Sequence, residues 1–266
     1  CTPGHQGMKL RDNLFRGNNM VIWVILALAF LVLIIAMLGY PRMTFPRQPS
    51  LEGVENPEAV QAYDRISRWP QFKLLRRRIV FEIKKHHPKG SIVDVGCGPG
   101  YLVADIAEAF PHLHVIGVDI AEEMIEVAAR NLSSLGLSER VEFRRGDAQN
   151  LPFEDNAADF VVSTLSLHHW SDPRQALQEI YRVLKPEGQF LLFDLRRNGR
   201  RLFYWLLRFA QTFVVPAALR RINEPIGSVL SSYTPAELEA LLSGTPFQQW
   251  RIEPGLGWMF VWGSKG

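Results

Sequence analysis

Residues 91–102 read SIVDVGCGPGYL and place three glycines within five positions, directly after a β-branched, apolar run. The run SIVDV predicts a buried strand, and a helical pattern follows from Tyr101. Glycine adopts positive φ and carries no Cβ, so a strand, a glycine turn and a helix together let backbone N–H groups approach a ligand closely. Glycine turns also serve packing alone. This stretch by itself therefore leaves a ligand site and a packing role both open.

The rest of the chain places this unit within a regular alternation of strands and helices. Strands are expected at 91–95, 114–119, 141–145, 159–165 and 188–195, and helices at 101–110, 121–135 and from Asp172 to about Leu184. This order is typical of a parallel, doubly wound α/β sheet. Further helices are expected near Pro57, after Pro70 and after the capping box that begins at Thr234. The stretch over 248–262 predicts a closing antiparallel pair of strands.

Composition excludes several classes of protein. The 266 residues contain two cysteines, Cys1 and Cys97, so neither a disulfide framework nor a cysteine-based zinc site is available, and we expect no metal. A net charge of +3 is ordinary and gives no support to a nucleic-acid partner.

The N-terminal region has a different composition from the rest. Residues 20–40 carry no charge over 21 positions, which as a helix would be roughly 31 Å long, enough to cross a bilayer. No small-residue cleavage pattern follows, so we expect an uncleaved anchor. The chain begins at Cys1, although Met8 would make a natural start. The expected organisation is a short tail over 1–19, a transmembrane helix over 20–40, a linker over 41–56 and a domain over 57–266.

Two aspartates follow the next two predicted strands. Asp119 ends the second strand, 21 residues after Gly98, where a carboxylate can accept hydrogen bonds from both hydroxyls of a ribose. Asp147 follows the third strand, where its carboxylate can accept from an adenine amine while the Ala148 N–H donates to the ring. A dinucleotide site would have its third glycine at position 101, which is Tyr101.

Five stretches in order carry a resemblance to a known family. They are VDVGCGPGYL, VIGVDIAEEMI, FRRGDAQNLPF, DFVVSTLSLHHW and RVLKPEGQFLLFD. Over residues 60–262 the chain resembles the class I S-adenosylmethionine-dependent methyltransferases, and within them the subgroup of ubiquinone and menaquinone biosynthesis enzymes. The resemblance implies a Rossmann-like sheet of seven strands, mostly parallel with an antiparallel last strand, and S-adenosylmethionine as cofactor.

The same resemblance implies roles for individual residues. The methionine end of the cofactor is expected to lie against Asp94, Gly96, Cys97, Gly98 and Gly100, with Leu165 beside it. Asp119 and Ile120 are expected at the ribose and adenine, and Asp147 and Ala148 at the adenine.

The sulfonium methyl group is already electrophilic, so the protein needs mainly to align the donor and the acceptor and, for some acceptors, to remove a proton. His168 is our candidate for a catalytic base or for steering the acceptor, and a structural role in the loop is the alternative. For His169 we favour the structural role. Tyr63 is a candidate to close over the cofactor.

The segment 196–232 is expected to form a lid, and its apolar stretch over 202–219 is bracketed by arginine pairs. A helix of this composition lies either at a membrane interface or against the sheet. With the apolar N-terminal stretch, this favours a small lipophilic acceptor, such as a quinone precursor or a lipid. We expect a single-pass membrane protein with its catalytic domain on the cytoplasmic side. The alternative is a non-catalytic, membrane-tethered binder of the same cofactor that acts in assembly or sensing. The methylated atom, whether O, N or C, and the oligomeric state stay open.

Overall fold

The structure, a computed structural model, describes residues 21–36, 42–49, 56–133, 135–137 and 140–266. The predicted tail over 1–19, the alternative starts at Cys1 and Met8, and parts of the predicted linker over 41–56 lie outside the described residues. The strands are β1 (Ser91–Val95), β2 (His114–Asp119), β3 (Val141–Arg145), β4 (Ala158–Thr164), β5 (Leu184–Leu195), β6 (Gln249–Pro254) and β7 (Trp258–Ser264). The helices are α2 (Pro57–Ser67), α3 (Pro70–Lys85), α4 (Tyr101–Ala109), α5 (Glu122–Ser133), α6 (Pro173–Val183), α7 (Arg201–Phe213), α8 (Ala217–Arg221), α9 (Ile226–Ser231) and α10 (Pro235–Leu242), with a short 3-10 turn η1 (Leu167–His169).

The seven strands form one sheet in the order β3-β2-β1-β4-β5-β7-β6. β7 pairs antiparallel with β5 and with β6, and the pairs among β1 to β5 are parallel. The predicted mostly parallel sheet with an antiparallel last strand is confirmed. The order reverses direction between β1 and β4, and in such sheets ligands bind beyond the carboxyl ends of the strands at this point.

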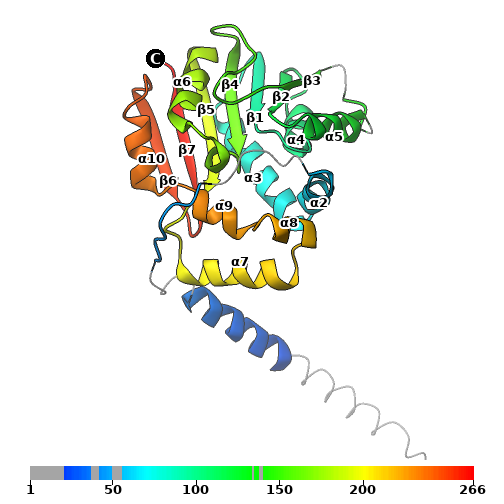
Figure 1. Ribbon diagram of the computed structural model, residues 1–266, viewed down its shortest axis with the longest axis vertical. Coiled ribbons are helices and arrows are strands. Elements are labelled where there is room, and N and C mark those ends of the chain that lie inside the picture. Colours follow the sequence, from blue (N-terminus) through cyan, green and yellow to red (C-terminus); the bar gives the residue numbers. More distant parts are fainter. Residues whose placement is uncertain (1–20, 37–41, 50–55, 134, 138–139) are drawn as a thin grey trace, which may run out of the picture.

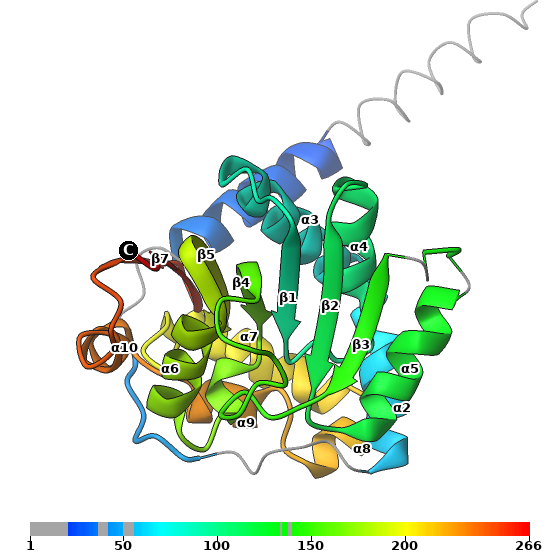
Figure 2. The same cartoon turned by 90° about the horizontal axis from the view of Figure 1, so that it is seen from above.

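Helices cover both faces of the sheet, as Figure 2 shows for α3 and α4 on one side and α6 and α10 on the other. Successive residues of a strand point to opposite faces. In β1, Ile92 packs with the helices α3 and α4, whereas Val93 packs with α6 and α10. Both cores are built from fully buried aliphatic side chains, which is why these strands read as apolar runs in the sequence.

Local signals determine where several helices begin. The Asp172 carboxylate accepts from the backbone N–H of Gln175 at 3.0 Å and caps α6. Thr234 and Glu237 form the predicted capping box of α10, in which each side chain accepts from the backbone N–H of the other residue. These caps satisfy N–H groups that have no partner within the helix, so the sequence alone locates them.

The segment between β5 and α10 forms three helices. Figure 1 shows α9 and α8 just beyond the carboxyl ends of the strands, with α7 further from the sheet. No residue of α7 is buried, whereas α8 and α9 bury Leu219, Ile226 and Val229. The expected lid is therefore built by α8 and α9, and α7 lies outside it.

The predicted transmembrane helix over 20–40 is not supported. Its described part, residues 21–36, is an α-helix with exposed apolar side chains, and its remaining residues lie outside the described ones. Across the described parts of the chain, none of the helices combines the length and the apolar character that a membrane span requires.

Candidate active site

A cavity of about 660 Å³ lies at the carboxyl ends of the central strands, within the size range of small-molecule sites. The expected site residues that line it are Asp94, Gly96, Cys97, Gly98, Asp119, Ile120, Asp147, Ala148 and Leu165. The opposite wall includes Tyr63, Phe72 and Leu75 from the first helices, Trp170 after η1, and Ile222, Glu224 and Leu230 from the lid. The cavity therefore has a side built by strand ends and a side built by helices.

Gly98 and Gly100 of the glycine turn have different roles, one at the cavity and one in helix packing. Gly98 has a φ of 51°, and a Cβ added there would meet nothing within 4 Å, so its backbone borders open space in the cavity. Gly100 caps α4 with a φ of 79°, and an added Cβ would lie 2.8 Å from the Cβ of Ala128. Gly100 does not line the cavity. Gly100 instead allows close packing between α4 and α5, and its expected cofactor contact stays a prediction.

Asp94 is a buried carboxylic acid in β1, one residue before the strand ends, and it lines the cavity. Its side chain is 1% exposed, and its Oδ1 atom has no hydrogen-bond partner among the described residues. Burial, and then the charge of Asp119, raise the pKa of Asp94 from 3.8 to about 8. A buried carboxylate oxygen without a donor is costly, and a bound cation would relieve that cost.

Asp119 joins the glycine turn to the start of α5. Its Oδ2 accepts from the N–H of Gly98 at 2.8 Å, and its Oδ1 accepts from the N–H of Ala121 at 3.0 Å. Burial raises the pKa of Asp119, while these backbone hydrogen bonds oppose the shift. The carboxylate is thereby oriented along one edge of the cavity and keeps lone pairs for hydroxyl donors.

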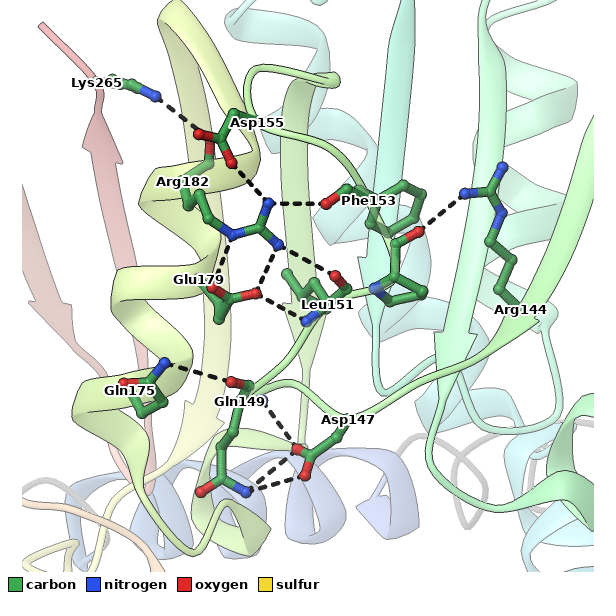
Figure 3. A network of polar contacts seen from close by, with 11 residues as sticks. Arg144, Asp147, Gln149, Leu151, Phe153, Asp155, Gln175, Glu179, Arg182 and Lys265 are labelled. Carbon is green, nitrogen blue, oxygen red and sulfur yellow. Dashed lines mark hydrogen bonds and ion pairs between the residues drawn. The ribbon is translucent and has the colours of Figure 1, made fainter.

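Asp147 lies in a loop that a polar network holds in place (Figure 3). Its Oδ1 accepts from the backbone N–H of Gln149 at 2.9 Å. Further along the loop, Glu179 accepts from the N–H of Leu151 at 2.9 Å. Arg182 pairs with Glu179 at 2.7 Å and also donates to two loop carbonyl groups, those of Leu151 and Phe153. Helix α6 thus fixes the loop that carries Asp147 and Ala148 into the cavity.

The lid contributes a buried acid to the opposite wall. Glu224 is 7% exposed, and its Oε2 accepts from the hydroxyl of Ser228 at 2.5 Å. Burial raises the pKa of Glu224. Burial, with the charges of Glu224 and Asp194, holds the pKa of Tyr63 well above its usual value. Tyr63 is therefore a protonated hydroxyl at neutral pH.

Comparisons with known proteins agree with this geometry. The methyltransferase domain family matches residues 93–192. A solved structure from Methanococcus maripaludis, described as an S-adenosyl-L-methionine-dependent methyltransferase, superposes with a TM-score of 0.62 at 23% identity, covering 82% of this chain and 97% of the other. A demethylmenaquinone methyltransferase of Symbiobacterium thermophilum is 34% identical over 173 residues, which cover 60% of this chain and 69% of that protein. The chain belongs to the S-adenosylmethionine-dependent methyltransferases.

Other relatives of this methyltransferase are matched over a smaller share of their own length. A biotin biosynthesis bifunctional protein of Teredinibacter turnerae is 32% identical over 143 residues, which cover 52% of this chain and 25% of that protein. The chain therefore spans about a quarter of that relative.

S-adenosylmethionine fits the strand side of the cavity. The unpartnered Oδ1 of Asp94 suits an ammonium group, the open space beside Gly98 admits close backbone contact, and Asp119 suits the hydroxyls of a ribose. When bound, this cofactor supplies a methyl group on a positively charged sulfur. The individual roles expected for the lining residues stay predictions, but the structure brings them to one cavity.

The two neighbouring histidines lie in different places relative to the cavity. His168, the candidate base, is 2% exposed and does not line the cavity, because its Nδ1 pairs with Asp194 at 2.7 Å. Burial alone would lower the pKa of His168, but the charge and hydrogen bond of Asp194 raise it overall. His169 does line the cavity, and burial together with the charge of His168 lowers its pKa to about 3. His168 is thus placed to support the site rather than to touch a substrate.

Sequence reasoning missed Glu224 and most of the helical wall. Glu224 lies in the connection between α8 and α9, outside any motif, and no periodicity marks it as buried. Its position follows only from the way in which the lid packs over η1 and α2.

Proposed function

We propose that this methyltransferase transfers a methyl group to a small lipophilic acceptor, such as a quinone precursor or a lipid. The apolar character of the helical wall supports this proposal most directly. Phe72, Leu75, Ile222, Leu230 and Trp170 face the cavity from outside the cofactor side. A site of this kind buries an apolar ring or chain, at about 25 cal/mol per Å² of apolar surface removed from water.

The outer face of α7 supports an acceptor that resides in a membrane. Trp205, Phe209 and Phe213 are between 50% and 72% exposed, and Arg201 and Arg208 lie on the same exposed face. The opposite face packs inward, where Phe203 contacts Trp258 at a ring distance of 6.1 Å. We propose that α7 rests on the surface of an anionic bilayer, with its aromatic side chains in the interface and its arginines at phosphates.

We also propose that the domain works on the cytoplasmic side, because its cofactor is an intracellular metabolite. The name of the demethylmenaquinone methyltransferase relative agrees with a quinone-related acceptor. Protease treatment of sealed membrane vesicles of known orientation tests on which side of the membrane the domain lies. Digestion of the domain by protease added to intact cells would contradict the cytoplasmic side.

Labelling tests the proposed acceptor. Membranes from cells that express the protein are incubated with methyl-labelled S-adenosylmethionine, and the lipid extract is separated and counted. We expect label in the lipid extract with the unmodified protein and none with Asp119→Ala, which removes a carboxylate from the cofactor side. Label found only in water-soluble products would contradict a lipophilic acceptor. Cofactor binding without any labelled product would favour the non-catalytic binder.

A further inference from the structure

Glu224 is a buried carboxylate on the side of the cavity that the cofactor residues do not occupy. It lies in the connection between α8 and α9, which Figure 1 places beyond the carboxyl ends of the strands. Among the described residues that line the cavity, the other carboxylates are Asp94, Asp119 and Asp147, and all three lie at or just beyond strand ends on the cofactor side. Glu224 is therefore the acid that an acceptor would meet.

The lid orients this carboxylate. The hydroxyl of Ser228 donates to Oε2 at 2.5 Å, and the backbone N–H of Glu224 donates to the carbonyl of Leu219 at 2.9 Å. The first hydrogen bond holds the carboxylate, the second holds the backbone of the connection that carries it, and the residue lines the cavity. A carboxylate held in a cavity wall is suited to accept a proton from a bound group.

The other ionisable groups near Glu224 are poorly suited to accept a proton from a bound group. The phenol of Tyr63 keeps its proton, because burial and the charge of Glu224 raise its pKa. The pKa of His169 is lowered to about 3, which makes its imidazole a weak base. His168 and Asp194 are paired to each other away from the cavity wall. Burial raises the pKa of Glu224, which increases its basicity as a carboxylate.

We propose that Glu224 is a catalytic residue that accepts the proton of a hydroxyl group on the acceptor. This inference rests on the proposed function and narrows its substrate to a hydroxyl-bearing apolar molecule, such as a phenol. The acceptor oxygen forms a bond to the methyl carbon, the carbon–sulfur bond breaks, and its electron pair stays on sulfur as a neutral thioether. The hydroxyl proton goes to Oε1 of Glu224 and from there to water.

Binding and turnover test this role separately. Binding is measured by calorimetry with the protein saturated in S-adenosylhomocysteine, using 1-naphthol and 1-methoxynaphthalene as a probe pair that differs in the hydroxyl donor. We expect the unmodified protein to prefer 1-naphthol by about tenfold or more, since hydrogen bonds to charged groups are worth about 1.5–3 kcal/mol. In Glu224→Gln this preference falls to about threefold or less, because the charge is absent.

Turnover of 1-naphthol is followed against pH. The kcat of Glu224→Gln falls by about 100-fold, the contribution of a general base, while its affinity for S-adenosylhomocysteine is unchanged. The unmodified protein loses kcat/KM at acid pH as Glu224 is protonated, and Glu224→Gln lacks this pH limb. Glu224→Asp keeps a carboxylate and restores part of the rate. Glu126→Gln, an exposed acid on α5, is the matched control and changes none of these readouts.

Three outcomes would overturn the proposal. They are no preference for 1-naphthol in the unmodified protein, a preference in Glu224→Gln equal to that of the unmodified protein, and kcat of Glu224→Gln within about threefold of the unmodified value. If membranes are labelled in the lipid extract but Glu224→Gln behaves as the control does, only the role of Glu224 fails. If the hydroxyl preference depends on Glu224 but no lipid is labelled, only the lipophilic acceptor fails.

Discussion

The Nδ1 atom of His168 lies 2.7 Å from Oδ1 of Asp194, and both side chains are at most 2% exposed. Asp194 also accepts from the backbone N–H of His168 at 2.9 Å. The pair therefore ties η1 to the end of β5 beneath the cavity, and it places the next residues, His169 and Trp170, in the cavity wall. This geometry favours the structural role that the sequence left open for His168.

We expect Asp194→Asn to destabilise the protein by about 3 kcal/mol, because it removes the charge that pairs with the buried ring of His168. The raised pKa of His168 means that the pair stabilises the fold fully below the ordinary histidine pKa and less as pH rises through the folded value. Urea unfolding should therefore show a larger loss at about pH 6 than at about pH 9. Equal losses at both values would contradict a charged pair.

Asp94→Asn should weaken cofactor binding and stabilise the free protein at alkaline pH. The pKa of Asp94 is raised from 3.8 to about 8, so the free energy of unfolding falls as pH rises from the lower value to the higher one and levels off above it. Binding an ammonium group needs the ionised form, so S-adenosylhomocysteine should bind the unmodified protein more tightly as pH rises through about 8. Calorimetry and thermal unfolding across this range measure both effects. Glu123→Gln, an exposed acid on α5, should change neither.

Gly98→Ala and Gly136→Ala form a matched pair. Both glycines have positive φ, 51° and 69°, and an added Cβ meets nothing within 4 Å at either position. Each substitution should cost about 1–2 kcal/mol of stability through backbone strain. Only Gly98→Ala should also weaken S-adenosylhomocysteine binding, because Gly98 lines the cavity. Equal cofactor affinities for the two variants would remove Gly98 from the proposed cofactor contact.

Arg182→Lys should loosen the loop that carries Asp147. Lysine cannot keep the paired contacts with Glu179 and the two loop carbonyl groups, so we expect a loss of about 2 kcal/mol in stability and faster hydrogen exchange over 147–153. Cofactor affinity should fall as well, because the loop presents Ala148 to the cavity. Arg251→Lys, in an exposed pair with Glu253, is the control and should leave the loop unchanged.

Combined substitution of Phe209→Ser and Phe213→Ser should reduce binding to vesicles of equal parts phosphatidylcholine and phosphatidylglycerol by at least about tenfold, because each phenyl ring contributes buried apolar area. Co-sedimentation measures the bound fraction. Leu74→Ser and Phe81→Ser on α3, where both side chains are also exposed, form the control pair. Binding that the α7 substitutions leave unchanged would show that α7 does not contact the bilayer.

Local sequence patterns predicted most strands of the sheet but only part of the helical wall of the cavity. β1, β2 and β3 match their expected ranges because buried parallel strands are short apolar runs between helices. β5 begins at Leu184, earlier than expected, because its pairing with β4 continues through a register shift that no local signal marks. The predicted span over 20–40 was judged from hydropathy alone, and among the described residues no helix meets the requirements of a membrane span.

The sequence by itself determined the sheet, the glycine turn and the aspartates at its strand ends, because each depends on residues close together in the chain. Asp94, Gly98 and Asp119 come from one strand–helix–strand unit, whose geometry is nearly obligatory. Only the tertiary structure decided that His168 faces Asp194 and that Glu224 enters the cavity. The first depends on how η1 packs on β5 and the second on how the lid packs over η1, and such packing joins residues far apart in the chain whose side-chain directions no periodicity encodes.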